Sequence, residues 1–170
     1  FAYHVYGAAL VVVRLDVLRG DYEIERAAIV HDVGRSLDPS VDLGQIEGAF
    51  AQGIGWSLLE ELKFSEEGRL LSDTLSTYKL PDAHFLASGV DVEFLPEADN
   101  PRAVLNSKAI GEPPLVYGIA GYFALLDALR AARPDGPAMY DLPLTPEKAL
   151  DYLSGSRPEF LAKAGKGGKR

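Results

Sequence analysis

Apolar and polar positions follow strand-like patterns at the start of the chain and again near its middle. Residues 2–18 alternate or run apolar, and residues 22–32 form a second such segment. Between them, residues 19–21 carry a turn signal, so the two segments are predicted to form an antiparallel hairpin. Residues 90–95 alternate strictly and predict another strand. Residues 63–81 suggest only short strands or turns, and residues 96–106 a polar loop.

Three segments have helical spacing instead. Asp38 and Pro39 are a cap and a first-turn proline, and they open a helix predicted over residues 40–62. Its apolar stripe recurs at steps of three and four at Leu43, Ile46, Phe50, Ile54, Leu58 and Leu62. A second helix is predicted from Pro114 to about Ala132, and it is apolar nearly all round as far as Leu126, which predicts that its first part is buried. A short helix over residues 145–154 begins at Thr145. The pattern predicts an α/β (α+β) fold with a mixed sheet and two long buried helices.

The face of the first helix opposite the apolar stripe is neither apolar nor charged. It carries Gln45, Gly48, Gln52 and Gly55. Glycines let another backbone or a flat ligand approach closely, and the amides offer both donors and acceptors. The pattern fits a cofactor or close packing against a neighbouring element equally well. Glu47 falls on the apolar stripe, and a buried carboxylate is costly without a partner, so we expect it to have a structural, hydrogen-bonded role.

Composition narrows the class of protein. A chain of 170 residues with 47% hydrophobic residues can bury one sizeable core. No apolar stretch reaches the length of a membrane span by inspection, and no signal peptide is visible, so we expect a cytoplasmic protein without membrane contact. The chain begins at Phe1, within a strand-like pattern, and we expect it to be a piece of a longer polypeptide.

Cysteine is absent, which excludes disulfides, iron–sulfur ligands and a thiol nucleophile from this chain. Its three histidines, His4, His31 and His84, follow no metal-ligand spacing and are expected to be structural. The net charge of −8 disfavours nucleic acid as a partner. The domain is predicted to span residues 1–154, and the basic, glycine-rich residues 155–170 are predicted to be a disordered tail.

Glu112 is the candidate for chemistry. It lies between Gly111, which has wide backbone freedom, and Pro113, which disfavours helical angles in the residue before it. Pro114 suits the first turn of the helix that follows. The sequence therefore predicts a carboxylate held on a stiff corner at a helix N-terminus, which suits a carboxylate that must meet a reacting atom. Such a corner is also found where a helix simply begins.

Several segments, in order, carry a family resemblance. Residues 29–39 read IVHDVGRSLDP, residues 42–50 DLGQIEGAF, residues 76–81 STYKLP and residues 107–114 SKAIGEPP. Over residues 1–154 the chain resembles the molybdopterin-binding subunit of the xanthine dehydrogenase and aldehyde oxidase family, the molybdenum hydroxylases. The resemblance implies a C-terminal part of that subunit. Such enzymes hydroxylate an electrophilic carbon with oxygen taken from water.

The resemblance implies particular roles. Glu112 is expected to be the catalytic base. Gln45 is expected to bind the pterin, together with the segment Lys108, Ala109, Ile110 and Gly111. No side chain is expected to ligate metal, because the molybdenum is held by the pterin. From the residues alone, Lys108 could equally bind phosphate or pair with an acid.

Electrons must leave this domain, since no iron–sulfur or flavin motif is present. Iron–sulfur clusters and FAD are therefore expected in other domains or subunits, which would be partners together with the rest of the molybdopterin subunit. The residues of these segments resemble those of xanthine dehydrogenases more than those of aldehyde oxidoreductases. This resemblance implies purine catabolism with hypoxanthine or xanthine as substrate. Aldehydes or other N-heterocycles remain open, as does a non-catalytic interaction module. The 170-residue piece is expected to be inactive alone, because it supplies only one cluster of contacts to a buried cofactor.

Overall fold

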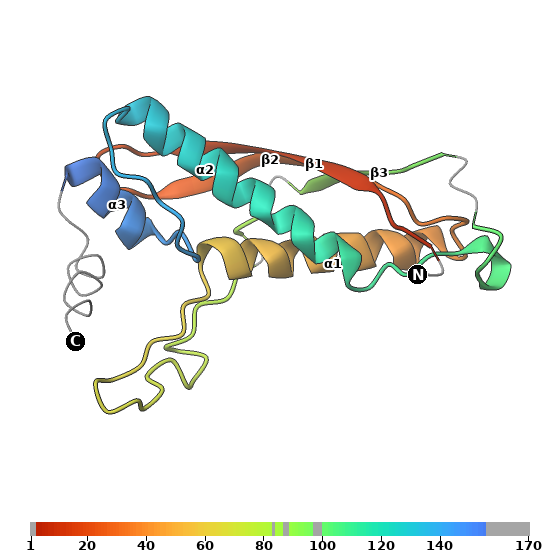
Figure 1. The fold of residues 1–170 in the computed structure, drawn as a ribbon, viewed down its shortest axis with the longest axis horizontal. Helices are drawn as coiled ribbons and strands as arrows, with labels where there is room; N and C mark the ends of the chain where they lie inside the picture. The colour runs from red at the N-terminus through yellow and green to blue at the C-terminus, as the bar shows by residue number, and fades with distance from the viewer. Residues whose placement is uncertain (1–2, 83, 87–88, 97–99, 156–170) are drawn as a thin grey trace, which may run out of the picture.

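A three-stranded sheet covered on one side by two helices forms the body of the molecule (Figure 1). The computed structural model describes residues 3–82, 84–86, 89–96 and 100–155. The strands are β1 (Gly7–Leu15), β2 (Tyr22–His31) and β3 (Val90–Phe94), and the helices are α1 (Pro39–Leu58), the 3₁₀ turns η1 (Val104–Asn106) and η2 (Pro113–Gly118), α2 (Ile119–Ala132) and α3 (Pro146–Ser154). The predicted α+β class with a mixed sheet is confirmed.

The sheet has β2 at its centre. β1 pairs antiparallel with β2, from Gly7 opposite His31 to Leu15 opposite Tyr22, so the hairpin prediction is confirmed. The first strand is shorter than residues 2–18 at both ends. At its C-terminal end the Asp16 carboxylate accepts hydrogen bonds from two backbone N–H groups of the turn, where the pairing stops. β3 joins the other edge of β2 in parallel.

α1 begins as its cap predicts. The Asp38 carboxylate accepts from the backbone N–H groups of Ser40 and Val41, at 3.0 and 3.2 Å, and Pro39 fills the first position. The middle of the predicted stripe is fully buried, at Ile46, Phe50, Ile54 and Leu58. Its two ends, Leu43 and Leu62, are exposed, and the helix ends at Leu58 and not at residue 62.

The prediction for Glu47 is wrong. The side chain is exposed, although 100° per residue places it between the buried Ile54 and Leu58 on the helical wheel; it lies in the N-terminal half of α1, where Leu43 is exposed as well. The wheel gives the direction of a side chain around the helix, but not whether a neighbouring element covers that turn.

The second long helix is interrupted in type. It starts as the 3₁₀ turn η2 and continues as α2, which packs across β1 and α1. The prediction that its first part is buried all round is wrong, because Val116 and Phe123 are more than half exposed. By length and composition the stretch Pro113–Ala132 could span a membrane. The prediction that no apolar stretch reaches this length is therefore wrong. The inner side of the stretch nevertheless lies in the core, where Leu125 and Leu129 are fully buried.

Two glycines let the helical segments cross at close range. A Cβ on Gly53 of α1 would overlap the backbone carbonyl oxygen of Leu115, and one on Gly118 would overlap the backbone of Gly53. The Ser57 hydroxyl donates to the Gly118 carbonyl at 3.0 Å across the same crossing. This contact fixes the end of η2 on α1.

Gly53→Ala should therefore destabilise the protein, although alanine is the better helix former. Overpacking a crossing made by rigid backbone costs about 1–3 kcal/mol. The matched control is Gly48→Ala on the same helix, where a Cβ would meet nothing within 4 Å. Thermal unfolding of the full-length protein should show a lower midpoint for Gly53→Ala only. Equal midpoints for the two variants would contradict the close crossing.

The remaining segments lie around this core. α3 begins as predicted, with Thr145 accepting from the backbone N–H of Lys148. Residues 59–82 extend from the end of α1 as an arm (Figure 1), in which Phe64 and Leu70 form an isolated bridge. The predicted tail, residues 155–170, falls outside the described residues except for Gly155.

Candidate functional site

The Glu112 corner is open. Glu112 precedes η2 and is exposed, and its side chain makes no capping hydrogen bond. Within the described part of the chain, the carboxylate has neither a hydrogen bond nor an ion pair. A helical turn does begin at this corner, and the Glu112 side chain does not cap it. A carboxylate available for a proton is therefore present at the predicted position.

The backbone conformation at this corner differs from the predicted one. Glu112 has φ −110° and ψ −39°, which is helical and not extended. Its carbonyl accepts from the backbone N–H of Leu115 at 3.1 Å, and this first 3₁₀ bond outweighs the preference imposed by Pro113. Gly111 does not have a positive φ, so the wider backbone freedom of glycine is not used at this position.

Gln45 reaches the same corner from α1. An ideal Cβ on Gly111 would lie 3.5 Å from the Gln45 Oε1, so the carboxamide is next to the loop. Gln45, Ala109 and Gly111 are all exposed, and a Cβ on Gly44 or Gly48 would meet nothing within 4 Å. The predicted neighbours thus meet on one uncovered face, although they are more than 60 positions apart in sequence.

Backbone donors on this face divide into used and unused ones. The N–H of Lys108 donates to the Val33 carbonyl at 3.0 Å, and that of Ala109 donates to the Tyr3 hydroxyl at 2.9 Å. The N–H groups of Ile110 and Gly111 donate to no residue that the structure describes. With the Gln45 carboxamide, they form a set of donors and acceptors that fits the polar edge of a pterin.

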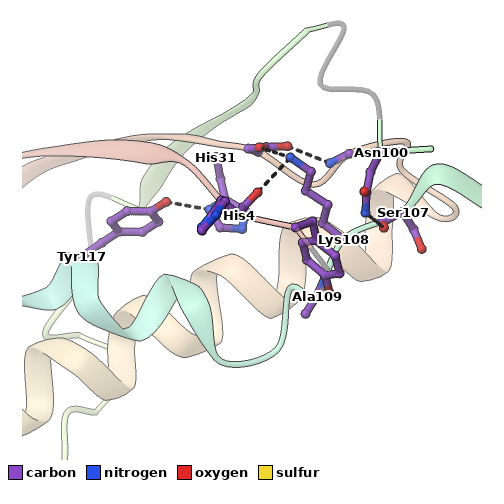
Figure 2. A network of polar contacts seen from close by, with 10 residues as sticks. His4, His31, Asn100, Ser107, Lys108, Ala109 and Tyr117 are labelled. Carbon is purple, nitrogen blue, oxygen red and sulfur yellow. Dashed lines mark hydrogen bonds and ion pairs between the residues drawn. The ribbon is translucent and has the colours of Figure 1, made fainter. Parts of the chain in front are cut away.

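Lys108 points inward, and its side chain does not join this face. Nζ lies 2.5 Å from Asp32 Oδ2 and 3.0 Å from the His4 carbonyl oxygen (Figure 2). The two charged side chains are 8% and 2% exposed. Of the two alternatives for Lys108, pairing with an acid is the one observed. Any contact of this residue with a cofactor is left to its backbone.

A second buried contact lies on the other side of Glu112. The His31 Nδ1 and the Tyr117 hydroxyl are 2.7 Å apart, and the rings meet edge to face (Figure 2). Burial lowers the pKa of His31, against an opposing effect of Asp32. Burial, and next the charge of Asp32, raise the pKa of Tyr117. Both groups are therefore neutral at pH 7, and the Nε2 of His31 has no partner among the described residues.

His31 is buried, and its Nδ1 meets the Tyr117 hydroxyl. No group of three or more His, Cys, Asp or Glu side chains that could hold a metal is found in the described ranges. The roles of Asp32 and Tyr117 were missed. An acid directly after a buried strand is a signal for Asp32, but nothing local in the sequence points to Tyr117.

Comparison with known proteins places this geometry in a family. Residues 1–86 match the model of the molybdopterin cofactor-binding domain. The chain belongs to this family. Xanthine dehydrogenase of Drosophila subobscura is 44% identical over 144 residues, which are 85% of this chain and 11% of that protein. Aldehyde oxidase 1 of Rattus norvegicus is 42% identical over 152 residues, covering 87% and 11%.

Solved structures agree with the sequence relatives. The aldehyde oxidoreductase of Desulfovibrio gigas superposes with a TM-score of 0.73 at 27% identity, over 91% of this chain and 16% of that one. The chain spans about a ninth of the length of the two sequence relatives named above. The resemblance to the molybdenum hydroxylases read from the sequence is confirmed.

Proposed function

We propose that the full-length protein is a molybdenum hydroxylase that oxidises hypoxanthine or xanthine with oxygen from water. This chain would supply its catalytic base and part of its cofactor site. The observation that carries the proposal is that the Glu112 carboxylate and the neighbouring N–H groups of Ile110 and Gly111 bond to no residue that the structure describes. The 44% identity to a xanthine dehydrogenase supports the substrate class.

Each residue then has a defined task. Molybdopterin, when bound, would supply the oxidation chemistry. Gln45 and the backbone of residues 108–111 would hold it through hydrogen bonds, the free donors being those of Ile110 and Gly111. The Glu112 carboxylate would accept the proton of the water-derived hydroxyl that attacks the substrate carbon. A general base needs hydrogen-bond reach to that proton, and an exposed carboxylate on an open face can provide it.

The rest of the site would come from other parts of the protein. Further segments of the molybdopterin subunit would complete the walls of the cofactor and substrate pocket. Iron–sulfur and FAD domains or subunits would accept the electrons, in a cytoplasmic enzyme. An aldehyde substrate is the second candidate, favoured by the 42% identity to an aldehyde oxidase.

The direct test uses the purified full-length protein. Molybdenum and pterin content should be close to one per subunit, and turnover should be greater with xanthine than with an aromatic aldehyde. A faster aldehyde reaction would move the proposal to the second candidate. A protein without molybdenum and pterin after expression in a cofactor-producing host would contradict both.

Gln45→Ala should weaken retention of the cofactor more than it changes substrate preference. Loss of one hydrogen bond to a buried partner costs about 1–3 kcal/mol. The control is Gln52→Ala, because Gln52 is also exposed on α1 but lies about 10 Å further along the axis. Molybdenum content per subunit should fall for Gln45→Ala and stay full for Gln52→Ala. Full occupancy with altered substrate preference would place Gln45 against the substrate.

A further inference from the structure

Two consecutive residues at the end of β2 contact the two sides of the Glu112 corner. His31 is the last residue of the strand, and Asp32 follows it. Asp32 binds the side chain of Lys108, four residues before Glu112. His31 meets the hydroxyl of Tyr117, five residues after Glu112. Figure 2 shows both contacts in one network.

The anchor on the Lys108 side is held at several points. One oxygen of Asp32 accepts from the backbone N–H of Gly34 at 3.0 Å, while the other binds Lys108. Lys108 is fixed in turn by its own backbone bond to Val33. These contacts are shielded from water, because Asp32 is 1% exposed. Hydrogen bonds of a charged pair are stronger where water is excluded.

The anchor on the Tyr117 side depends on space as well as on bonding. His31 is fully buried, and a Cβ on Gly7 of β1 would overlap the Tyr117 hydroxyl. The neighbouring strand therefore leaves room for the tyrosine at this point. The hydrogen bond joins the end of β2 to η2, which is the turn that starts at the corner itself.

We propose that His31 and Asp32 are positioning residues for Glu112. The Glu112 side chain has no bond of its own among the described residues, and its backbone takes no special conformation. Its position is therefore set by its two flanks, both of which are tied to the same strand end. The inference rests on the proposed function, in which Glu112 is the base, and misplacing a catalytic group by about 1 Å can cost 10²-fold in rate.

The first variant is Tyr117→Phe, in full-length enzyme loaded with molybdenum. It keeps the ring and removes only the hydroxyl that meets His31. We expect kcat to fall about tenfold or more, with KM and molybdenum content unchanged. The control is Tyr122→Phe. Tyr122 lies on α2, and the substitution removes a buried hydroxyl that donates to the Met139 carbonyl at 3.2 Å. Its kcat should equal that of the wild type.

A second readout does not depend on activity. Amide hydrogen exchange over residues 109–118 should become faster in Tyr117→Phe and unchanged in Tyr122→Phe, in enzyme with or without cofactor. Asp32→Asn, which retains an acceptor for Gly34, should give the same increase and the same loss of kcat. If Asp32→Asn does not fold, Tyr117→Phe decides alone.

Glu112→Gln in the same assay separates the two levels of the argument. A near-wild-type kcat for Glu112→Gln would refute the proposed function. An inactive Glu112→Gln, with wild-type kcat for Tyr117→Phe and Asp32→Asn, would refute the positioning role. Faster exchange without a loss of kcat would refute it too, as would equal losses in Tyr117→Phe and Tyr122→Phe.

Discussion

Glu112→Gln is expected to lower kcat at least about 10²-fold while leaving the fold and the molybdenum content unchanged. Glutamine keeps the size of the side chain and can still hydrogen-bond, but it cannot take up a proton at neutral pH. General-base catalysis contributes about 10²–10⁴-fold. Because the carboxylate makes no hydrogen bond or ion pair with described residues, its replacement should remove chemistry without breaking any such bond of the fold.

A purely structural Glu112 would behave differently. At a helix N-terminus, loss of the charge would cost less than about 1 kcal/mol of stability and leave kcat nearly unchanged. Glu66→Gln is the control for loss of one negative charge, since Glu66 is exposed on the arm. Single-turnover rates on variants with matched molybdenum content distinguish the two cases. A fully loaded Glu112→Gln enzyme with the wild-type rate would end the catalytic assignment.

Local signals predicted the elements well. Asp38 and Thr145 cap helices where the sequence places them, because a cap acts on N–H groups two or three residues away. The hairpin followed from two alternating segments and one turn. The parallel pairing of β2 with β3 could not be predicted, because it joins segments some sixty residues apart. Nothing within either strand specifies that register.

The candidate residues came from local patterns, and their contacts with distant segments did not. The sequence identified Glu112 on a stiff corner and Gln45 on the polar face of a helix, and the structure places Gln45 beside Gly111, the residue before Glu112. The prediction of an extended backbone at Glu112 was wrong. A following proline only disfavours helical angles, and one 3₁₀ hydrogen bond from the Leu115 N–H outweighs that preference. The alternatives for Lys108 were decided by Asp32, which lies 76 positions earlier and which no local pattern connects to it.

That buried pair should have the largest effect on stability. Lys108→Met keeps the length of the side chain but leaves the Asp32 carboxylate, 2% exposed, without its cation. Breaking a buried pair by removing one partner costs about 3–5 kcal/mol, because an uncompensated charge stays in the interior. The unfolding midpoint of the full-length protein should fall sharply. Asp91→Asn, which breaks an exposed pair with Arg26, should change it little.

The double variant Lys108→Met with Asp32→Asn tests the cause. It removes both charges, and asparagine can still accept from the Gly34 backbone N–H as Asp32 does. If the stranded charge causes the loss, the double variant should be more stable than Lys108→Met alone, since removing a whole buried pair is far less costly than removing half of it. If Lys108 instead stabilises mainly through packing and its bond to the His4 carbonyl, the double variant should be as unstable as the single one. Unfolding midpoints of the three variants distinguish these cases, and equal midpoints for the single and double variants would rule out the charge as the cause.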